Sequence, residues 1–160
     1  MKLYRKMSVC VGLVVASFIV LNAGMVCAEM LLLPDAVVTV EGKVVKGKRA
    51  SAHPAVREVL MTFHRAEAAV QKEDLHSLMT VYSPSYNYHG LKQVDVRRVW
   101  GEVFTHYNKL ASIHLFSAIT ILQADSQLHA EVICTGGLYG NEESTGERIT
   151  LDSWFHEVHY

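Results

Sequence analysis

Three long segments near the C-terminal end of the chain have the composition of β-strands. They span residues 112–124, 127–139 and 147–160 and are rich in Ile, Val, Thr and aromatic residues, the types that are enriched in strands. Turn signals separate them, first Asp125-Ser126 and then the polar loop 140–146, so we expect neighbouring antiparallel strands. Each segment exceeds the usual strand length of about 5–6 residues. This length predicts a strongly curved sheet.

Upstream of these segments, three stretches carry apolar residues at helical spacing. They are residues 54–72, 75–82 and 93–109, and their apolar stripes are suited to cover one face of a sheet. Asp74 precedes the second stretch and is a good N-cap residue. In the third stretch we expect Trp100 to be among the most buried side chains. The pattern predicts one α+β domain, residues 53–160, in which three helices pack on the concave face of a curved antiparallel sheet.

Residues 29–52 have a weaker pattern. The apolar stretches 37–40 and 44–45 flank Glu41-Gly42-Lys43 and allow a short hairpin. Basic residues and glycines surround them, however, which is more typical of a solvated arm. We therefore expect residues 29–52 to be a flexible lead-in that at most pairs with an edge of the sheet.

The first 28 residues have the three parts of a secretory signal peptide. Lys2 and Arg5 are basic, residues 9–20 are apolar, and small residues precede a cleavage position after Ala28. The apolar part is shorter than the roughly 20 residues that a transmembrane helix needs, which favours cleavage over an uncleaved membrane anchor. Cys27 also allows a lipoprotein signal, although the residues before it do not resemble a lipobox. We expect a secreted or periplasmic protein.

Composition excludes several kinds of partner and stabilisation. After cleavage Cys134 is the one cysteine left, so an internal disulfide cannot form and the core must provide the stability. The 15 basic and 16 acidic residues nearly cancel, which gives no reason to expect nucleic acid as a partner. The nine histidines include His114, His129 and His156 on three different strands, but they lack the spacing of a metal site. We therefore expect no metal and no cofactor.

Several motifs follow one another in an order typical of one protein superfamily. They are residues 75–82 (LHSLMTVY), 83–86 with Gly90, the helix 94–107, and Trp154-Phe155-His156 in the last strand. In this order the chain resembles the nuclear-transport-factor-2-like superfamily, an α+β cone that includes the SnoaL-like polyketide cyclases. The resemblance implies a pocket between the concave face of the sheet and the helices. It also implies a final strand that would follow Tyr160 and is missing, and we expect a homodimer.

Alternation along the last strand suggests one candidate site. Asp152, Trp154 and His156 share one strand face, so Asp152 and His156 could flank a substrate as an acid–base pair with Trp154 between them. If this face is convex, they are surface or dimer-contact residues instead. In that case the odd-numbered residues, Ile149, Leu151 and Phe155, belong to the core.

A second candidate is aromatic. Tyr82, Tyr86 and Tyr88 precede the third helix and, together with Trp100 and Trp154, could bind a ligand at the mouth of the pocket. Equally, they could be core aromatics whose hydroxyl groups reach water.

Two functions are compatible with these patterns. The first is an exported domain that binds a small hydrophobic molecule or a protein partner in its pocket. The second is a SnoaL-like enzyme that performs acid–base chemistry, of isomerase, cyclase or dehydratase type, on a small hydrophobic substrate. Convergence of two or more titratable side chains inside the pocket favours the enzyme, whereas a lining of Val, Leu, Phe and Tyr alone favours binding.

Overall fold

The structure, a computed structural model, describes residues 32–124 and 127–160. The expected signal peptide and its cleavage site lie outside these residues. No helix in the described part of the chain is long and apolar enough to cross a membrane. In chain order the elements are β1 (Leu32–Val40), β2 (Lys43–Val45), α1 (Lys48–Ala52), α2 (Pro54–Gln71), α3 (Leu75–Met79), β3 (Asn87–Tyr88), β4 (Leu91–Lys92), α4 (Gln93–His106), β5 (Tyr107–Ala124), β6 (Gln127–Glu142) and β7 (Arg148–His159).

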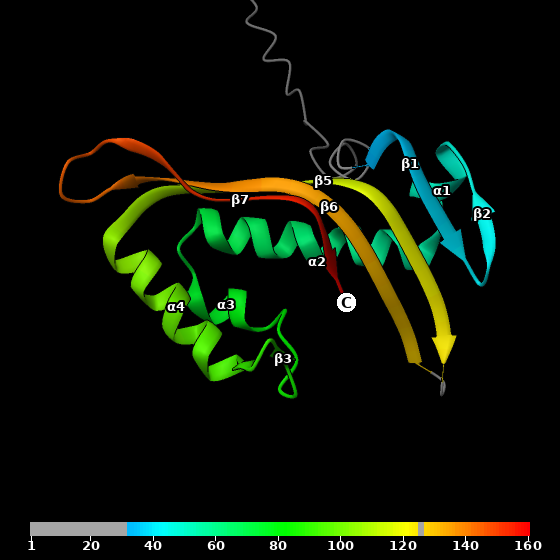
Figure 1. Cartoon of the computed structure of the whole chain (residues 1–160), viewed down its shortest axis with the longest axis horizontal. Helices are drawn as coiled ribbons and strands as arrows, with labels where there is room; N and C mark the ends of the chain where they lie inside the picture. Colours follow the sequence, from blue (N-terminus) through cyan, green and yellow to red (C-terminus); the bar gives the residue numbers. More distant parts are fainter. Residues whose placement is uncertain (1–31, 125–126) are drawn as a thin grey trace, which may run out of the picture.

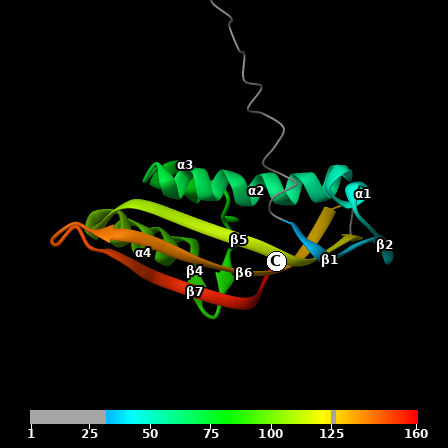
Figure 2. The same ribbon diagram turned by 90° about the horizontal axis from the view of Figure 1, so that it is seen from above.

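A large curved sheet and several helices make up this α+β fold. The sheet has the strand order β2-β1-β5-β6-β7, and it arches over α2 (Figure 1). Strands β5, β6 and β7 pair antiparallel, which confirms the three expected strands. From above, α2 runs along one side of the sheet and β7 along the other (Figure 2). Within the described residues no strand pairs with the outer edge of β7; the homodimer stays a prediction.

The segment that we expected to be a flexible lead-in is ordered over its described residues. β1 pairs antiparallel with β2 and parallel with β5, where Val38 lies opposite Ile119. Glu41 and Gly42 make the turn of the hairpin with positive φ angles, and the short helix α1, which the sequence did not predict, follows. Val38 is fully buried. The hairpin and the pairing with a strand of the sheet, which we had allowed for, are therefore both present. The identity of the partner strand was not predicted, because β5 lies far along the chain, where a local pattern cannot reveal it.

The helices agree more closely with the sequence. α2 begins at Pro54 as expected, and the Asp74 side chain caps α3 by accepting a hydrogen bond from the Ser77 backbone N–H at 3.0 Å. α4 ends at His106, earlier than expected, because the chain continues directly into β5. The buried residue of α4 is Val96. Trp100 is half-buried, less buried than Val96, and it packs against the apolar cluster that contains Leu78.

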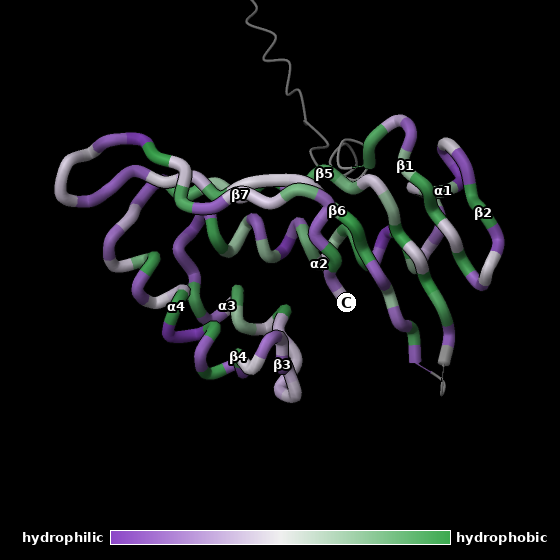
Figure 3. Tube along the Cα trace, in the orientation of Figure 1, coloured by the Kyte–Doolittle hydropathy of each residue, from purple (hydrophilic) through white to green (hydrophobic). Residues whose placement is uncertain are grey.

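Two apolar clusters hold the layers together. One joins β1 and the first half of α2 to β5 and β6, with Phe116 and Leu60 at its centre. The other joins the end of α2 to α3, β5 and β6, with Val70, Leu78 and Leu110 buried in it. Figure 3 shows apolar residues recurring along α2 and along β5 and β6. Trp154 packs against both clusters, so it lies at the junction between them.

Strand β7 departs from simple alternation at two points. Asp152 pairs with Leu138 and Thr150 with Tyr139, which leaves Leu151 as an extra residue on β7. Further on, Trp154 pairs with Gly136 and Glu157 with Cys134, so two β7 residues lie opposite one β6 residue. At this second bulge His156 has a φ of 52°. Each extra residue changes which side chains face the helices.

Candidate functional site

A cavity of about 740 Å³ opens between the concave face of the sheet and the helices. Its walls come from α2, from the segment between α3 and β3, from α4 and from the three long strands. The cavity therefore lies under the arch of the sheet, where the resemblance implied a pocket (Figure 1). The lining includes Phe63, Glu67, Tyr82, His114, Trp154 and His159.

Glu67 on α2 and His114 on β5 form a largely buried polar pair in this cavity. Their side chains are 15% and 12% exposed. Glu67 Oε1 lies 2.8 Å from His114 Nδ1 and accepts the His114 backbone N–H at 3.1 Å. Because a carboxylate accepts hydrogen bonds and does not donate them, the proton of the pair resides on Nδ1. In the neutral form of His114, the other ring nitrogen, Nε2, then carries a lone pair.

The Nε2 atom of His114 is the free end of this pair. Within residues 32–124 and 127–160 no hydrogen-bonding partner contacts it. Aromatic rings hold the imidazole, with Phe63 at 5.1 Å, Trp154 at 4.9 Å and Phe116 at 6.3 Å between ring centroids. A hydrogen-bond acceptor is thus fixed in an apolar cavity, and both its tautomer and its ring orientation are set by the protein.

A second polar group, Cys134 with His159, lies next to the pair. Cys134 Sγ is 3.3 Å from His159 Nε2 and accepts the Trp154 indole N–H at 3.2 Å. Burial raises the pKa of the Cys134 thiol to about 11, so the sulfur stays protonated and is not a nucleophile at neutral pH. Burial likewise lowers the pKa of His159, the Glu157 carboxylate opposes this, and His114 adds to it. His159 is therefore a neutral side chain at the wall of the cavity.

The lowered pKa of His159 predicts a pH dependence of stability. Above about pH 6.5 the imidazole is neutral in both the folded and the unfolded chain, and its contribution is fully present. As the pH falls below that value the unfolded state binds a proton first, so stability is lost until the folded pKa is reached. We expect His159→Gln to reduce the slope of unfolding free energy against pH below about pH 6.5. Urea denaturation at several pH values measures it. The exposed His129 provides the control: if His159→Gln and His129→Gln give the same slope, the prediction is wrong.

The tyrosines that precede α4 all lie in the lining of the cavity, together with Trp100 and Trp154. The Tyr82 and Tyr86 rings meet edge to face at 5.3 Å, and the Trp100 indole N–H donates to the Tyr82 hydroxyl at 3.3 Å. Tyr88 is 39% exposed. Their proposed role in binding stays a prediction, but their position at the cavity agrees with it.

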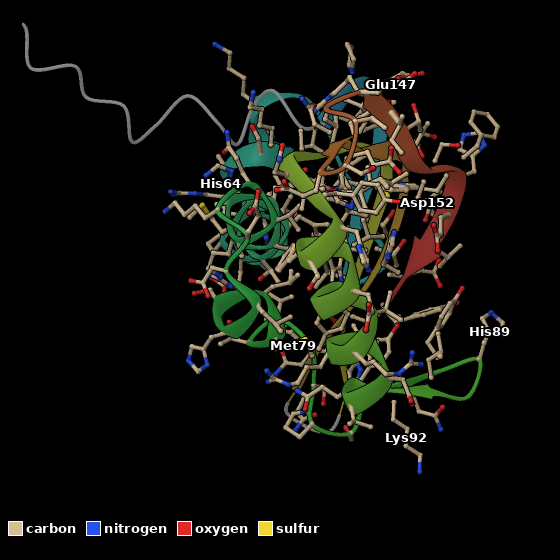
Figure 4. The ribbon with its side chains drawn as sticks, turned by 90° about the vertical axis from the view of Figure 1, so that its left-hand side faces the viewer. His64, Met79, His89, Lys92, Glu147 and Asp152 are labelled. Carbon is tan, nitrogen blue, oxygen red and sulfur yellow. The ribbon has the colours of Figure 1, made fainter. Side chains whose placement is uncertain are left out.

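Asp152 and His156 are not brought together. Asp152 lies exposed at the rim of the cavity, and its Oδ1 accepts the Ser153 backbone N–H at 2.8 Å. Figure 4 shows it on β7, across the molecule from α2. His156 is exposed and outside the lining. The second bulge explains this difference, because alternation fails there and His156 leaves the face that Asp152 and Trp154 share.

The alternative assignment of β7 faces is also only partly right. Leu151 packs in the second apolar cluster, as the odd-numbered face requires. Phe155, on the same expected face, is 77% exposed. Neither the even-numbered nor the odd-numbered residues of β7 therefore share one face along the whole strand. The two bulges are again the reason.

The Glu67–His114 pair was missed from the sequence, although a signal was present. Buried Val56, Leu60 and Val70 and half-buried Phe63 form a stripe with alternating steps of four and three along α2. Glu67 occupies a position of that same stripe. A carboxylate at a core-facing position is costly to bury unless it has a hydrogen-bonding partner, and this partner is His114. In the described part of the chain no group of three or more His, Cys, Asp or Glu residues is placed to hold a metal ion.

Comparison with known proteins finds weak similarity to solved structures. No family model matches the sequence, and no curated protein matches it. A solved structure from Catenulispora acidiphila is similar at a TM-score of 0.43 and 14% identity, over 64% of this chain and 76% of that one. Another, described as a putative calcium/calmodulin-dependent protein kinase II association domain from Xanthomonas campestris, has a TM-score of 0.32 and 13% identity, over 62% and 87% of the two chains. The chain is therefore characterised by its own geometry, a mixed α+β fold with a large curved sheet over an open cavity.

Proposed function

We propose that this chain is an exported nuclear-transport-factor-2-like domain that binds a small, largely apolar molecule in its cavity. The order of helices and long antiparallel strands supports the superfamily, and the pattern of residues 1–28 supports export. One observation carries the binding function: a cavity of about 740 Å³ with aromatic walls holds one fixed and free hydrogen-bond acceptor, His114 Nε2. Small-molecule sites typically combine apolar walls with a few placed polar groups.

The position of His114 Nε2 restricts the chemical groups that the ligand can carry. A molecule that fills the cavity buries apolar surface against Phe63 and Trp154, which provides affinity in proportion to the buried area. A hydroxyl or amine on the same molecule donates a hydrogen bond to His114 Nε2 and fixes the orientation. The ligand is thus an apolar body with at least one donor group.

Tryptophan fluorescence provides a direct test of binding. The chain has two tryptophans, Trp100 and Trp154, and both line the cavity, so an occupant changes their emission. We expect the neutral dye N-phenyl-1-naphthylamine to bind and to quench them. Ala66→Phe, which places a ring in the cavity, should weaken binding at least about tenfold by filling the space that the dye needs.

The matched control is Ala52→Phe, because Ala52 is exposed and outside the lining. Circular dichroism establishes that both variants fold. Equal dye affinity in Ala66→Phe and wild type would contradict binding in this cavity.

A second candidate function is acid–base catalysis, and the Glu67–His114 hydrogen bond favours it. With Nδ1–H directed at Glu67, Nε2 can accept a proton from a C–H or O–H group of a bound substrate, and the carboxylate stabilises the imidazolium that forms. The test is exchange of the acidic protons of 2-tetralone with deuterated water, followed by NMR. Catalysis by this pair predicts a rate above that of buffer that falls by about 10²–10⁴ in His114→Gln. Exchange at the buffer rate would exclude this function for such ketones and leave the binding function in place.

A further inference from the structure

The charged residues that line the cavity all have the same sign. They are Glu58, Glu67, Asp152 and Glu157, and no Lys or Arg is among the described residues of the lining. The whole chain, by contrast, has 15 basic and 16 acidic residues. The excess of acidic side chains is therefore a property of the cavity and not of the protein as a whole.

Two of these carboxylates are already engaged. Glu58 lies 3.2 Å from the Arg65 guanidinium and is largely exposed, so its charge is offset outside the cavity. Glu67 is held by the backbone and side chain of His114. Neither is free to pair with a ligand.

Glu157 is the carboxylate without a partner. It lies opposite the buried Cys134 in the β6–β7 ladder, it lines the cavity and it is half-buried. Within residues 32–124 and 127–160 it makes no side-chain hydrogen bond and no salt bridge. A half-buried carboxylate without a counter-charge carries a desolvation cost that a cation relieves.

A tyrosine cluster, Tyr82, Tyr86 and Tyr88, lines the same cavity as Glu157. Burial raises the pKa of Tyr86, and the charges of the other two tyrosines and of Glu157 raise it further, which places the carboxylate within electrostatic reach of the cluster. The faces of tyrosine and tryptophan rings carry negative potential and attract cations. The rings and the carboxylate thus favour the same kind of group.

We propose that the ligand of this cavity is an organic cation: an apolar body that carries a protonated amine or quaternary ammonium group between Glu157 and the tyrosine cluster. This inference rests on the proposed binding function and adds the charge of the ligand. An anion would meet carboxylates and, among the described residues of the lining, no Lys or Arg. A neutral molecule would leave Glu157 unpaired, whereas either cation pairs with it, and the N–H of a protonated amine also suits the acceptor His114 Nε2.

Three probes with the same benzyl body and different charge test the proposal. They are benzyltrimethylammonium, its neutral analogue neopentylbenzene, in which carbon replaces nitrogen, and the anion phenylmethanesulfonate. Tryptophan fluorescence and calorimetry give their affinities for the full chain. We expect the cation to bind about tenfold more tightly than the neutral analogue and the anion to bind more weakly than either. Added salt should weaken the binding of the cation and leave that of the neutral probe unchanged.

Substitution of Glu157 provides a second test, in which the affinities of the same probes are measured again. We expect Glu157→Gln to weaken the binding of benzyltrimethylammonium about tenfold and to leave neopentylbenzene unaffected. Glu131→Gln removes an equal charge from β6 at an exposed position outside this cavity and should change neither affinity.

The outcomes separate the two proposals. If neopentylbenzene binds as tightly as the cation, the charge preference is wrong and the binding function stands. If none of the three probes binds while N-phenyl-1-naphthylamine does, the charge preference is wrong and the binding function stands; if the dye also fails to bind, both proposals are overturned.

Discussion

Replacing Phe116 by alanine is expected to lower the free energy of unfolding by about 3–5 kcal/mol, the range for truncation of a large core aromatic. The Phe116 side chain is fully buried, and its ring meets Phe63 edge to face at 4.9 Å. Truncation removes these contacts and leaves a cavity between α2 and the sheet. Urea denaturation measures the change.

Phe155 is the matched control for this substitution. Its side chain is 77% exposed, so Phe155→Ala should change the free energy of unfolding by no more than about 0.5 kcal/mol. A loss below about 1 kcal/mol for Phe116→Ala, or equal losses for the two variants, would show that the core is not centred on Phe116.

Gly136→Ala is expected to destabilise the protein by about 1–3 kcal/mol, the usual cost of overpacking. A Cβ atom at this position would overlap the carbonyl oxygen of Ile113 and approach Trp154 Cζ2 to 2.8 Å. The backbone of β5 cannot move aside easily, so the Trp154 indole and the strand must shift. Tryptophan fluorescence should therefore change along with the denaturation midpoint.

The neighbouring glycine provides the control for this variant. A Cβ atom at Gly137 would meet the far end of the Tyr139 side chain, with the hydroxyl at 2.8 Å, and that ring can rotate away. Gly137→Ala should therefore cost less than Gly136→Ala. The reverse order would show that β5, β6 and Trp154 are less closely packed than the structure indicates.

Most of the secondary structure could be predicted from the sequence because it depends on local patterns. The three long strands, α2 from Pro54 and the Asp74 cap of α3 all depend on residues within a few positions of one another. The pairing of β1 with β5 does not, since nothing near Val38 specifies a partner such as Ile119. The sequence therefore suggested a lead-in where the structure has a strand.

The candidate site was less predictable for two physical reasons. Alternation assumes an unbroken strand, and the bulge at His156 breaks it, so the Asp152–His156 pair does not form. The Glu67–His114 pair joins a helix to a strand that lies far along the chain, and no local pattern specifies such a contact. The tyrosines were found at the cavity because they are close together in the sequence.

The parallel pairing of β1 with β5 has a consequence for folding during synthesis. β1 leaves the ribosome early, but its partner strand follows only after all the helices have been made. At a synthesis rate of about 5–20 residues per second, β1 remains unpaired for several seconds. Strands β5, β6 and β7 are joined by short connections and can pair as soon as they emerge, whereas contacts distant in sequence form slowly. We therefore expect β1 to dock last, and its apolar residues, Val38 among them, to stay exposed until it does.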